Sequence, residues 1–214
     1  RTLLALDPES PAIRAFLFQH LAMTMARKAA SDPERREWIR EGLQIVDEGL
    51  ALDPESFDLQ RAKGLAFFIR TENPDPAFTQ VCTQEYHDPP VRLAPACFES
   101  ALNTRDDMNT RLFLIASLWN AARFEMREKR FTSASEFWKK SLADLPLWLD
   151  LMEEPQARND LEAYYRDLEA YCTLMGQSTN QMEENQAARG KTMKKLKERI
   201  MANPYCELSD ELDP

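Results

Sequence analysis

The chain has 214 residues and a formal net charge of −9, and 43% of its residues are hydrophobic and 29% charged, as in an ordinary folded protein. The acidic balance disfavours nucleic acid as a partner, because the chain would repel phosphate backbones, and it favours a basic protein or peptide instead. Five glycines against thirteen prolines disfavour hairpin-rich β architecture and phosphate-binding loops. No apolar stretch is long enough to predict a membrane span.

Apolar residues recur at helical spacing along most of the chain. In chain order the pattern predicts helices over residues 11–29, 34–51, 56–71, 91–103, 107–128 and 131–144. No segment of comparable length alternates as a strand would. The sequence therefore predicts an all-α protein.

An internal repeat marks two of the predicted helix boundaries. The pentapeptide Leu-Asp-Pro-Glu-Ser occurs at residues 6–10 and again at 52–56, which places the copies 46 residues apart. Each copy follows the apolar end of one helix and comes before a new helical pattern, with a proline that stops the first helix. The repeat predicts consecutive antiparallel helical hairpins.

Residues 72–90 are rich in proline and are expected to form an inserted loop, with a short helix near residues 77–86. Such insertions into repeats often carry function. Cys82, Glu85, His87 and Asp88 have a spacing that would allow a metal site, although a second ligand pair is missing. A polar loop with one packed cysteine is the preferred interpretation, and a metal-binding or enzymatic role is the alternative.

After Pro146 the apolar spacing predicts two further helices, over residues 156–175 and 179–202. They are expected to form a C-terminal capping hairpin within residues 147–203, because repeat stacks need a terminal cap with one polar face. The basic run at 191–199 is then expected to be the solvated face of the cap, and contact of its apolar stripe with a membrane or a partner helix is the alternative. Residues 204–214 are acidic and are expected to form a tail.

Two helix pairs resemble the tetratricopeptide repeat, whose signature is W-x2-L-G-x2-Y in a first helix and A-x3-F with a closing proline in a second. The first-helix pattern is found at Leu112-x2-Ile115-Ala116-x2-Trp119 and at Gln60-x2-Lys63-Gly64-x2-Phe67. The second-helix pattern is found at Ala134-x3-Trp138-x2-Ser141-Leu142, closing at Pro146, and at Ala94-x3-Phe98-x2-Ala101-Leu102.

The resemblance covers residues 1–146 and is that of a divergent member with lengthened helices. Closing positions at Pro8, Pro54, Asp106 and Pro146 give periods of 46, 52 and 40 residues, instead of the usual 34. The resemblance implies an α-solenoid of antiparallel hairpins and, as a class of function, a protein-protein interaction scaffold.

Tetratricopeptide-like stacks are similar in presenting the first helix of each pair to a peptide or helix in a concave groove. Counted from each helix start, the groove-facing residues would be Gln19, Met23, Arg61, Leu65, Phe68, Phe113, Ser117 and Asn120. An alternative for Phe68 and Phe113 is a place in the core. His20 is expected to be a packing or groove residue.

No catalytic motif, cofactor site or metal site is predicted, and a structural spacer within a larger chain is a further alternative to the scaffold. The four cysteines have wide, irregular spacing that predicts reduced, partly buried thiols. A cytoplasmic location is favoured, and because the chain begins at Arg1, an upstream signal or anchor stays open.

Overall fold

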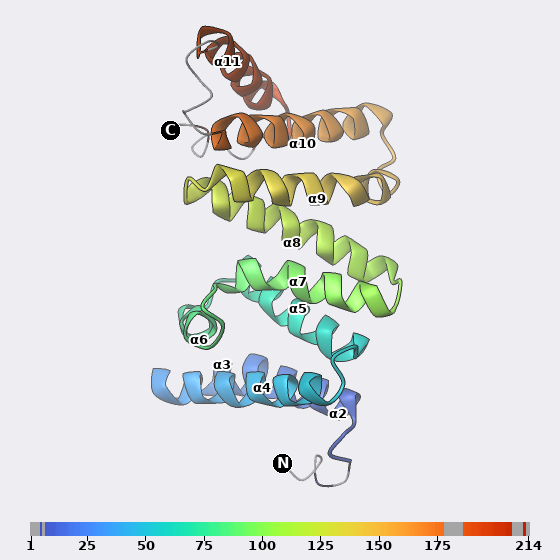
Figure 1. The fold of residues 1–214 in the computed structure, drawn as a ribbon. Helices are drawn as coiled ribbons and strands as arrows, with labels where there is room; N and C mark the ends of the chain where they lie inside the picture. Colours follow the sequence, from blue (N-terminus) through green and yellow to red (C-terminus); the bar gives the residue numbers. More distant parts are fainter. Residues whose placement is uncertain (1–4, 6, 178–185, 207–211, 213–214) are drawn as a thin grey trace. The chain divides into compact units, whose positions relative to one another are not determined.

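The computed structural model describes residues 5, 7–177, 186–206 and 212, and within them every regular element is a helix (Figure 1). The all-α prediction is therefore confirmed. No helix in these residues is long and apolar enough to cross a lipid bilayer. The chain divides into two compact units, residues 1–117 and 118–214. The predicted domain boundary at residue 146 stays a prediction.

The first unit begins with one continuous helical run, made of α2, η1 and α3, and continues with four separate helices, α4 to α7. Their bounds are α2 Pro11–Gln19, η1 His20–Met25, α3 Ala26–Lys28, α4 Asp32–Leu52, α5 Phe57–Glu72, α6 Pro76–Tyr86 and α7 Pro90–Thr104, followed by α8 Met108–Arg127, which continues into the second unit. The run α2, η1 and α3 packs against α4, α5 packs against α7, and α2 also contacts α5.

Three of these helices start at a polar cap followed by proline. The hydroxyl of Ser10 accepts the backbone N–H of Ile13, and that of Ser31 accepts the N–H of Glu34. Asp75 does the same for the first turn of α6. Such caps satisfy N–H groups that have no partner inside the helix, and proline has no N–H to lose there.

The core of the first unit depends on a close approach of α5 and α7. Phe67 on α5 and Phe98 on α7 are almost fully buried. At Gly64 an added Cβ would lie 2.9 Å from the Phe98 ring, so a side chain at this position would force the two helices apart.

Helix α6 lies within residues 72–90, and the short helix expected near residues 77–86 is therefore present. Its side chains Phe78, Val81 and Cys82 are fully buried. The helix contacts both α4 and α7. The insertion is thus a part of the core and not only a surface loop.

In the second unit, α10 packs against both of its neighbours in sequence. The helices are α9 Phe131–Leu149, α10 Pro155–Gly176 and α11 Gln186–Ala202, together with the end of α8. Trp138, Leu168, Cys172 and Ile200 are the centre of its largest apolar cluster. Of the predicted helix at 179–202, residues 178–185 lie outside the described residues.

The prediction that Pro146 closes a helix is wrong. Helix α9 continues through Pro146 to Leu149, and the carbonyl of Pro146 accepts the N–H of Asp150. Leu145 and Leu149 are both buried against Leu161 of α10. This burial stabilises the last turn, while proline removes a single hydrogen bond from the helix.

Most of the predicted acidic tail at 204–214 lies outside the described residues. Leu212 is an exception, because it is fully buried in the main cluster of the second unit. The hydroxyl of Tyr171 donates to the carbonyl of Leu212 over 2.9 Å.

Candidate functional site: a pocket between the first helical run and α5

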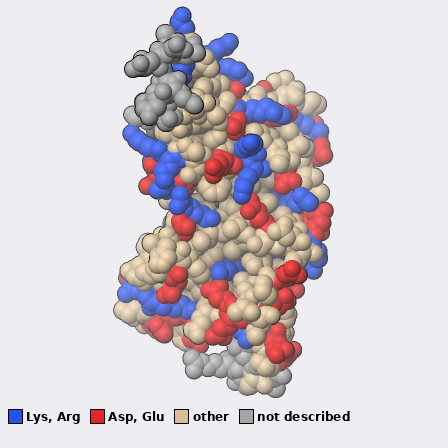
Figure 2. All heavy atoms as spheres, viewed as in Figure 1, with Lys and Arg blue, Asp and Glu red and all other residues tan. Residues whose placement is uncertain are grey.

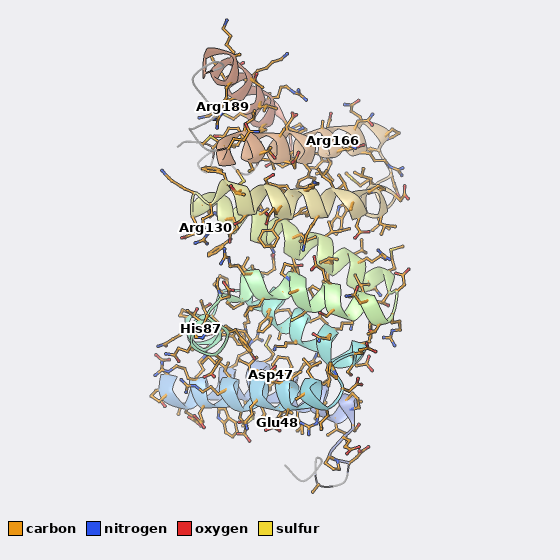
Figure 3. All side chains as sticks on the ribbon, in the orientation of Figure 1. Asp47, Glu48, His87, Arg130, Arg166 and Arg189 are labelled. Carbon is orange, nitrogen blue, oxygen red and sulfur yellow. The ribbon has the colours of Figure 1, made fainter. Side chains whose placement is uncertain are left out.

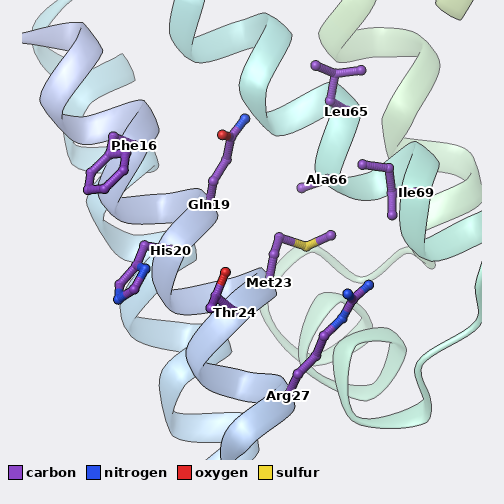
Figure 4. A pocket seen from close by; sticks show the side chains of 9 residues that line it. All are labelled: Phe16, Gln19, His20, Met23, Thr24, Arg27, Leu65, Ala66 and Ile69. Carbon is purple, nitrogen blue, oxygen red and sulfur yellow. The ribbon is translucent and has the colours of Figure 1, made fainter.

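A pocket of about 460 Å³ opens between the run α2–η1–α3 and helix α5 (Figure 4). Its lining residues are Phe16, Gln19, His20, Met23, Thr24, Arg27, Leu65, Ala66 and Ile69. The volume is within the range of sites that bind small molecules or single anchoring side chains.

Helical spacing explains how the first run lines this pocket. Gln19, Met23 and Arg27 follow one another four residues apart, and Figure 4 shows all three reaching toward α5. Phe16 and His20 form a neighbouring row, with their rings stacked at a centroid distance of 6.0 Å. Two ridges of the same run therefore border the pocket.

A π-helical turn lies at this site. Residues His20–Met25 form η1, and the N–H of Ala26 bonds to the carbonyl of Leu21, five residues earlier. The wider turn takes one more residue than an α-turn and changes the direction of the side chains that follow. Single π-turns inside α-helices occur frequently at functional sites.

The rim of the pocket exposes apolar surface. The Phe16 side chain is 57% exposed and Ile69 is 37% exposed. The floor is apolar too, because Ala66 is almost fully buried there and Met23 and Leu65 are half-buried. Covering this exposed apolar surface with an apolar group of a ligand would be favourable, because it removes the surface from water.

The charge of the pocket is positive at one end. Arg27 is exposed, and it has no hydrogen bond or ion pair with any residue that the structure describes. None of the nine lining residues is acidic. Elsewhere, acidic and basic side chains are interspersed over the visible face in Figure 2. The net charge of the chain therefore says little about this local site.

Next to the pocket, Asp75 joins three helices. One of its oxygens, Oδ1, accepts the N–H groups of Ala77 and Phe78 in α6. The other, Oδ2, lies 2.7 Å from Arg35 Nη2 of α4 and 3.4 Å from Arg70 Nη1 of α5. The carboxylate and Arg70 are almost fully buried, whereas Arg35 is partly exposed.

Arg70 has more donors than this junction satisfies. Its side chain is 4% exposed, and its Nε and Nη2 atoms are buried without a hydrogen-bond partner. Burial lowers the pKa of the guanidinium, Asp75 opposes that shift, and Arg27 and Arg35 add to it by repulsion. Arg27 is thus close enough to Arg70 for their charges to interact.

At its other end, α6 is held by a second polar cluster. The Tyr86 hydroxyl donates to Asp47 Oδ2 over 2.6 Å, and Lys63 Nζ lies 2.5 Å from Asp47 Oδ1. Figure 3 shows Asp47 on α4. Burial, and then the bond to Asp47, raise the pKa of Tyr86. Helix α6 is therefore held by polar contacts at both ends: by the ion pairs of Asp75 at its start and by the Tyr86–Asp47 hydrogen bond at its end.

The predicted groove residues fall into several places. Gln19, Met23 and Leu65 line the pocket together. Arg61 instead donates from Nε to Thr110 Oγ1 on α8, over 3.1 Å. Arg61 therefore does not line this pocket, and its place in a groove stays a prediction.

The remaining predicted residues lie farther along the chain. The rings of Phe68 and Phe113 meet edge-on at 5.6 Å, and Phe113 also stacks on Phe98. Ser117 is buried and donates its hydroxyl to the carbonyl of Leu114. Asn120 is half-buried and belongs to the second unit.

Phe16, Thr24, Arg27, Ala66 and Ile69 were not among the residues predicted from sequence. A usable signal existed for two of them, because Arg27 and Ile69 continue the predicted rows of Met23 and Leu65 by one turn.

The proposed metal ligands of the insertion do not converge. Cys82 is fully buried, whereas Glu85 is exposed and His87, at the end of α6 in Figure 3, is also exposed. Burial raises the pKa of the Cys82 thiol, which disfavours the thiolate that binds metals. Among the residues that the structure describes, no group of three His, Cys, Asp or Glu side chains could hold a metal ion.

Known proteins give no further guide to this site. No protein-family model matches the chain, and no curated protein or solved structure matches it significantly.

Proposed function

We propose that the chain is a tetratricopeptide-like stack that binds a segment of a partner protein between its first helices. The observation that carries the proposal is the pocket between α2–η1–α3 and α5, with exposed apolar residues at its rim and a π-turn in its wall. In such a stack these two helical stretches would be the first helices of consecutive hairpins.

The packing of α5 on α7 supports the assignment of repeats. Gly64 and Phe67 occupy the small and aromatic positions of the first-helix signature, and Phe98 occupies the aromatic position of the second. Gly64 lies directly against Phe98, as a small residue facing a bulky one would in a tetratricopeptide hairpin. The motif residues Gly64 and Phe98 thus make the close helix-helix contact that the small and aromatic positions of the tetratricopeptide signature provide.

The length of the pocket favours a peptide segment over a single small group. From Phe16 to Arg27 its wall runs along roughly 16 Å of helix, at 1.5 Å per residue. An extended segment or about three turns of a helix would cover this distance. Phe16, Met23 and Ile69 would then bury an apolar anchor of the partner, and Gln19 would bind its backbone.

Selection from a random peptide library on the immobilised chain tests this proposal. Ile69→Gln removes an exposed apolar residue from the rim, and Leu52→Gln is the matched control, because Leu52 is also an exposed helical residue but does not line the pocket. We expect the selected peptides to share an apolar anchor. Their affinity should fall by about tenfold with Ile69→Gln and stay unchanged with the control.

Equal binding to both variants would place the ligand elsewhere and contradict the proposal. If the folded chain selects no peptide at all, a structural spacer becomes the better interpretation of the helices. Circular dichroism of each variant before selection shows that the helices are intact.

A further inference from the structure

We infer that the Arg27 end of the pocket binds an anionic side chain of the partner, next to the apolar anchor. This inference rests on the proposed function, and it specifies the chemistry of the bound segment. It also departs from the basic partner that the net charge of the chain suggests.

The first step is the local excess of positive charge. Arg70 feels the charges of both Arg27 and Arg35, and Asp75 pairs with Arg35 and with Arg70. Three guanidinium groups and one carboxylate give these four side chains a net charge of +2. Charges that are partly shielded from water attract counter-charges strongly, because the surrounding dielectric is low.

The second step is the shortage of hydrogen-bond acceptors. Arg70 Nε, Arg70 Nη2 and Arg35 Nε are all buried without a partner. Asp75 is already engaged through both oxygens, by α6 backbone N–H groups on one side and by the two arginines on the other. The cluster therefore has more N–H donors than the described residues supply acceptor oxygens, and a ligand oxygen could accept from them.

The third step is access from the pocket. Figure 4 shows the Arg27 side chain extending from α3 toward α5, on the side of Met23 and Ile69. Arg70 is one helical turn after the pocket residue Ala66 on α5, so it lies on the face of α5 that borders the pocket, beneath the surface. A carboxylate or phosphate placed on Arg27 would therefore also feel the field of Arg70.

These positions predict which features of the ligand are adjacent. The apolar side chains of Met23 and Ile69 lie beside Arg27, so an apolar anchor and an anionic residue must be neighbours in the bound segment. Arginine binds carboxylates and phosphates through paired N–H donors, so both acidic and phosphorylated residues fit this chemistry. A phosphorylated residue brings more charge and more acceptor oxygens than a carboxylate does.

Short end-blocked peptides provide the probes. One has leucine followed by glutamate, and matched forms carry glutamine, lysine or phosphoserine in place of the glutamate. Blocked ends remove terminal charges that would bind arginine by themselves. We expect the glutamate and phosphoserine peptides to bind, phosphoserine more tightly, and the glutamine and lysine peptides to bind at least about tenfold more weakly. Added salt should weaken the first two.

Arg27→Gln is the matching change in the protein, because Arg27 is exposed and its replacement leaves the buried Asp75 junction intact. Lys28→Gln is the control, since Lys28 is an exposed cation at the next position that does not line the pocket. We expect Arg27→Gln to weaken glutamate peptides by about tenfold and to leave glutamine peptides unchanged, whereas Lys28→Gln changes neither.

Equal affinity for the glutamate and glutamine peptides, or an equal effect of both substitutions, would overturn the inference. So would a library selection that yields anchors without acidic neighbours, but in that case loss of binding with Ile69→Gln would still support the groove. Failure of the anionic site and failure of the groove are thereby distinguished.

Discussion

Asp167 on α10 is a carboxylate whose burial costs stability at neutral pH. It lies 2.8 Å from Arg199, and its side chain is 11% exposed. Burial raises its pKa above the ordinary value of 3.8, and Arg199 only partly opposes that shift. A raised folded pKa means that stability is fully present below about pH 3.9 and is lost as pH rises through the folded value.

We therefore expect wild-type protein to lose stability relative to Asp167→Asn as pH rises from about 3 to 7. The asparagine keeps an acceptor for Arg199 and removes the charge. Urea unfolding of both proteins at several pH values measures the difference between their free energies of unfolding. A difference that does not change with pH would show that Asp167 has the same pKa in both states.

The cysteines differ in their expected reactivity. Burial raises the pKa of Cys97 and of Cys172 to about 12, and it raises that of Cys82 as well, whereas Cys206 is only half-buried. Thiol reagents attack through the thiolate, so Cys206 should react first in the folded protein at pH 8. Mass spectrometry of the modified peptides checks the order. Early modification of Cys97 would mean that the first unit opens locally.

At the scale of elements, helical periodicity was sufficient to predict the all-α fold and most helix positions, because buried faces repeat every three or four residues. It could not predict the π-turn at His20–Met25, since one added residue changes the hydrogen bonding without changing composition. The predicted end of α9 at Pro146 was too early. That prediction used only the local helix-breaking effect of proline, whereas the burial of Leu149, which stabilises the last turn, depends on tertiary packing.

The candidate site was predictable in part. Gln19, Met23 and Leu65 were predicted from the tetratricopeptide resemblance, and all three line the pocket. The burial of Arg70 depends on Asp75, which is distant from its other partner, Arg35, in sequence. Helical spacing could have placed Arg27 at the pocket. A single sequence contains no periodic signal for a tertiary ion pair, so the buried charge of Arg70 could not be foreseen.

The contact of α6 with α4 and α5 gives a prediction about Asp75. Asp75→Asn keeps an oxygen that can cap α6 but removes the charge that compensates Arg35 and Arg70. Breaking a buried ion pair in this way leaves a charge without a partner, so we expect a loss of about 3–5 kcal/mol in the free energy of unfolding. Urea unfolding followed by circular dichroism measures it.

Asp88→Asn is the control for this change, because Asp88 pairs with Arg92 one helical turn away and both side chains are partly exposed. It should cost less than about 1 kcal/mol. Adding Arg70→Met to Asp75→Asn should recover part of the loss, since the buried charge is then removed as well. Similar costs for Asp75→Asn and Asp88→Asn would mean that water reaches the Asp75 junction.

At the scale of the whole molecule, the division into two compact units predicts that stability and binding can be changed separately. Trp138 is 1% exposed and lies at the centre of the second unit, whereas the pocket belongs to the first. Trp138→Ala should lower the stability of the second unit by about 3–5 kcal/mol, as large-to-small changes in a core do. The affinity of a pocket peptide should stay the same, because residues without shared contacts act almost additively.

Hydrogen exchange with and without peptide locates both effects in one experiment. In Trp138→Ala, faster exchange should be confined to α9, α10 and α11, while peptide binding should still slow exchange in α2 and α5. Helix α8 contains the boundary between the units and is the informative element. If the substitution accelerates exchange in α5 and weakens the peptide, α8 transmits the loss of packing, and the two units fold as one cooperative structure.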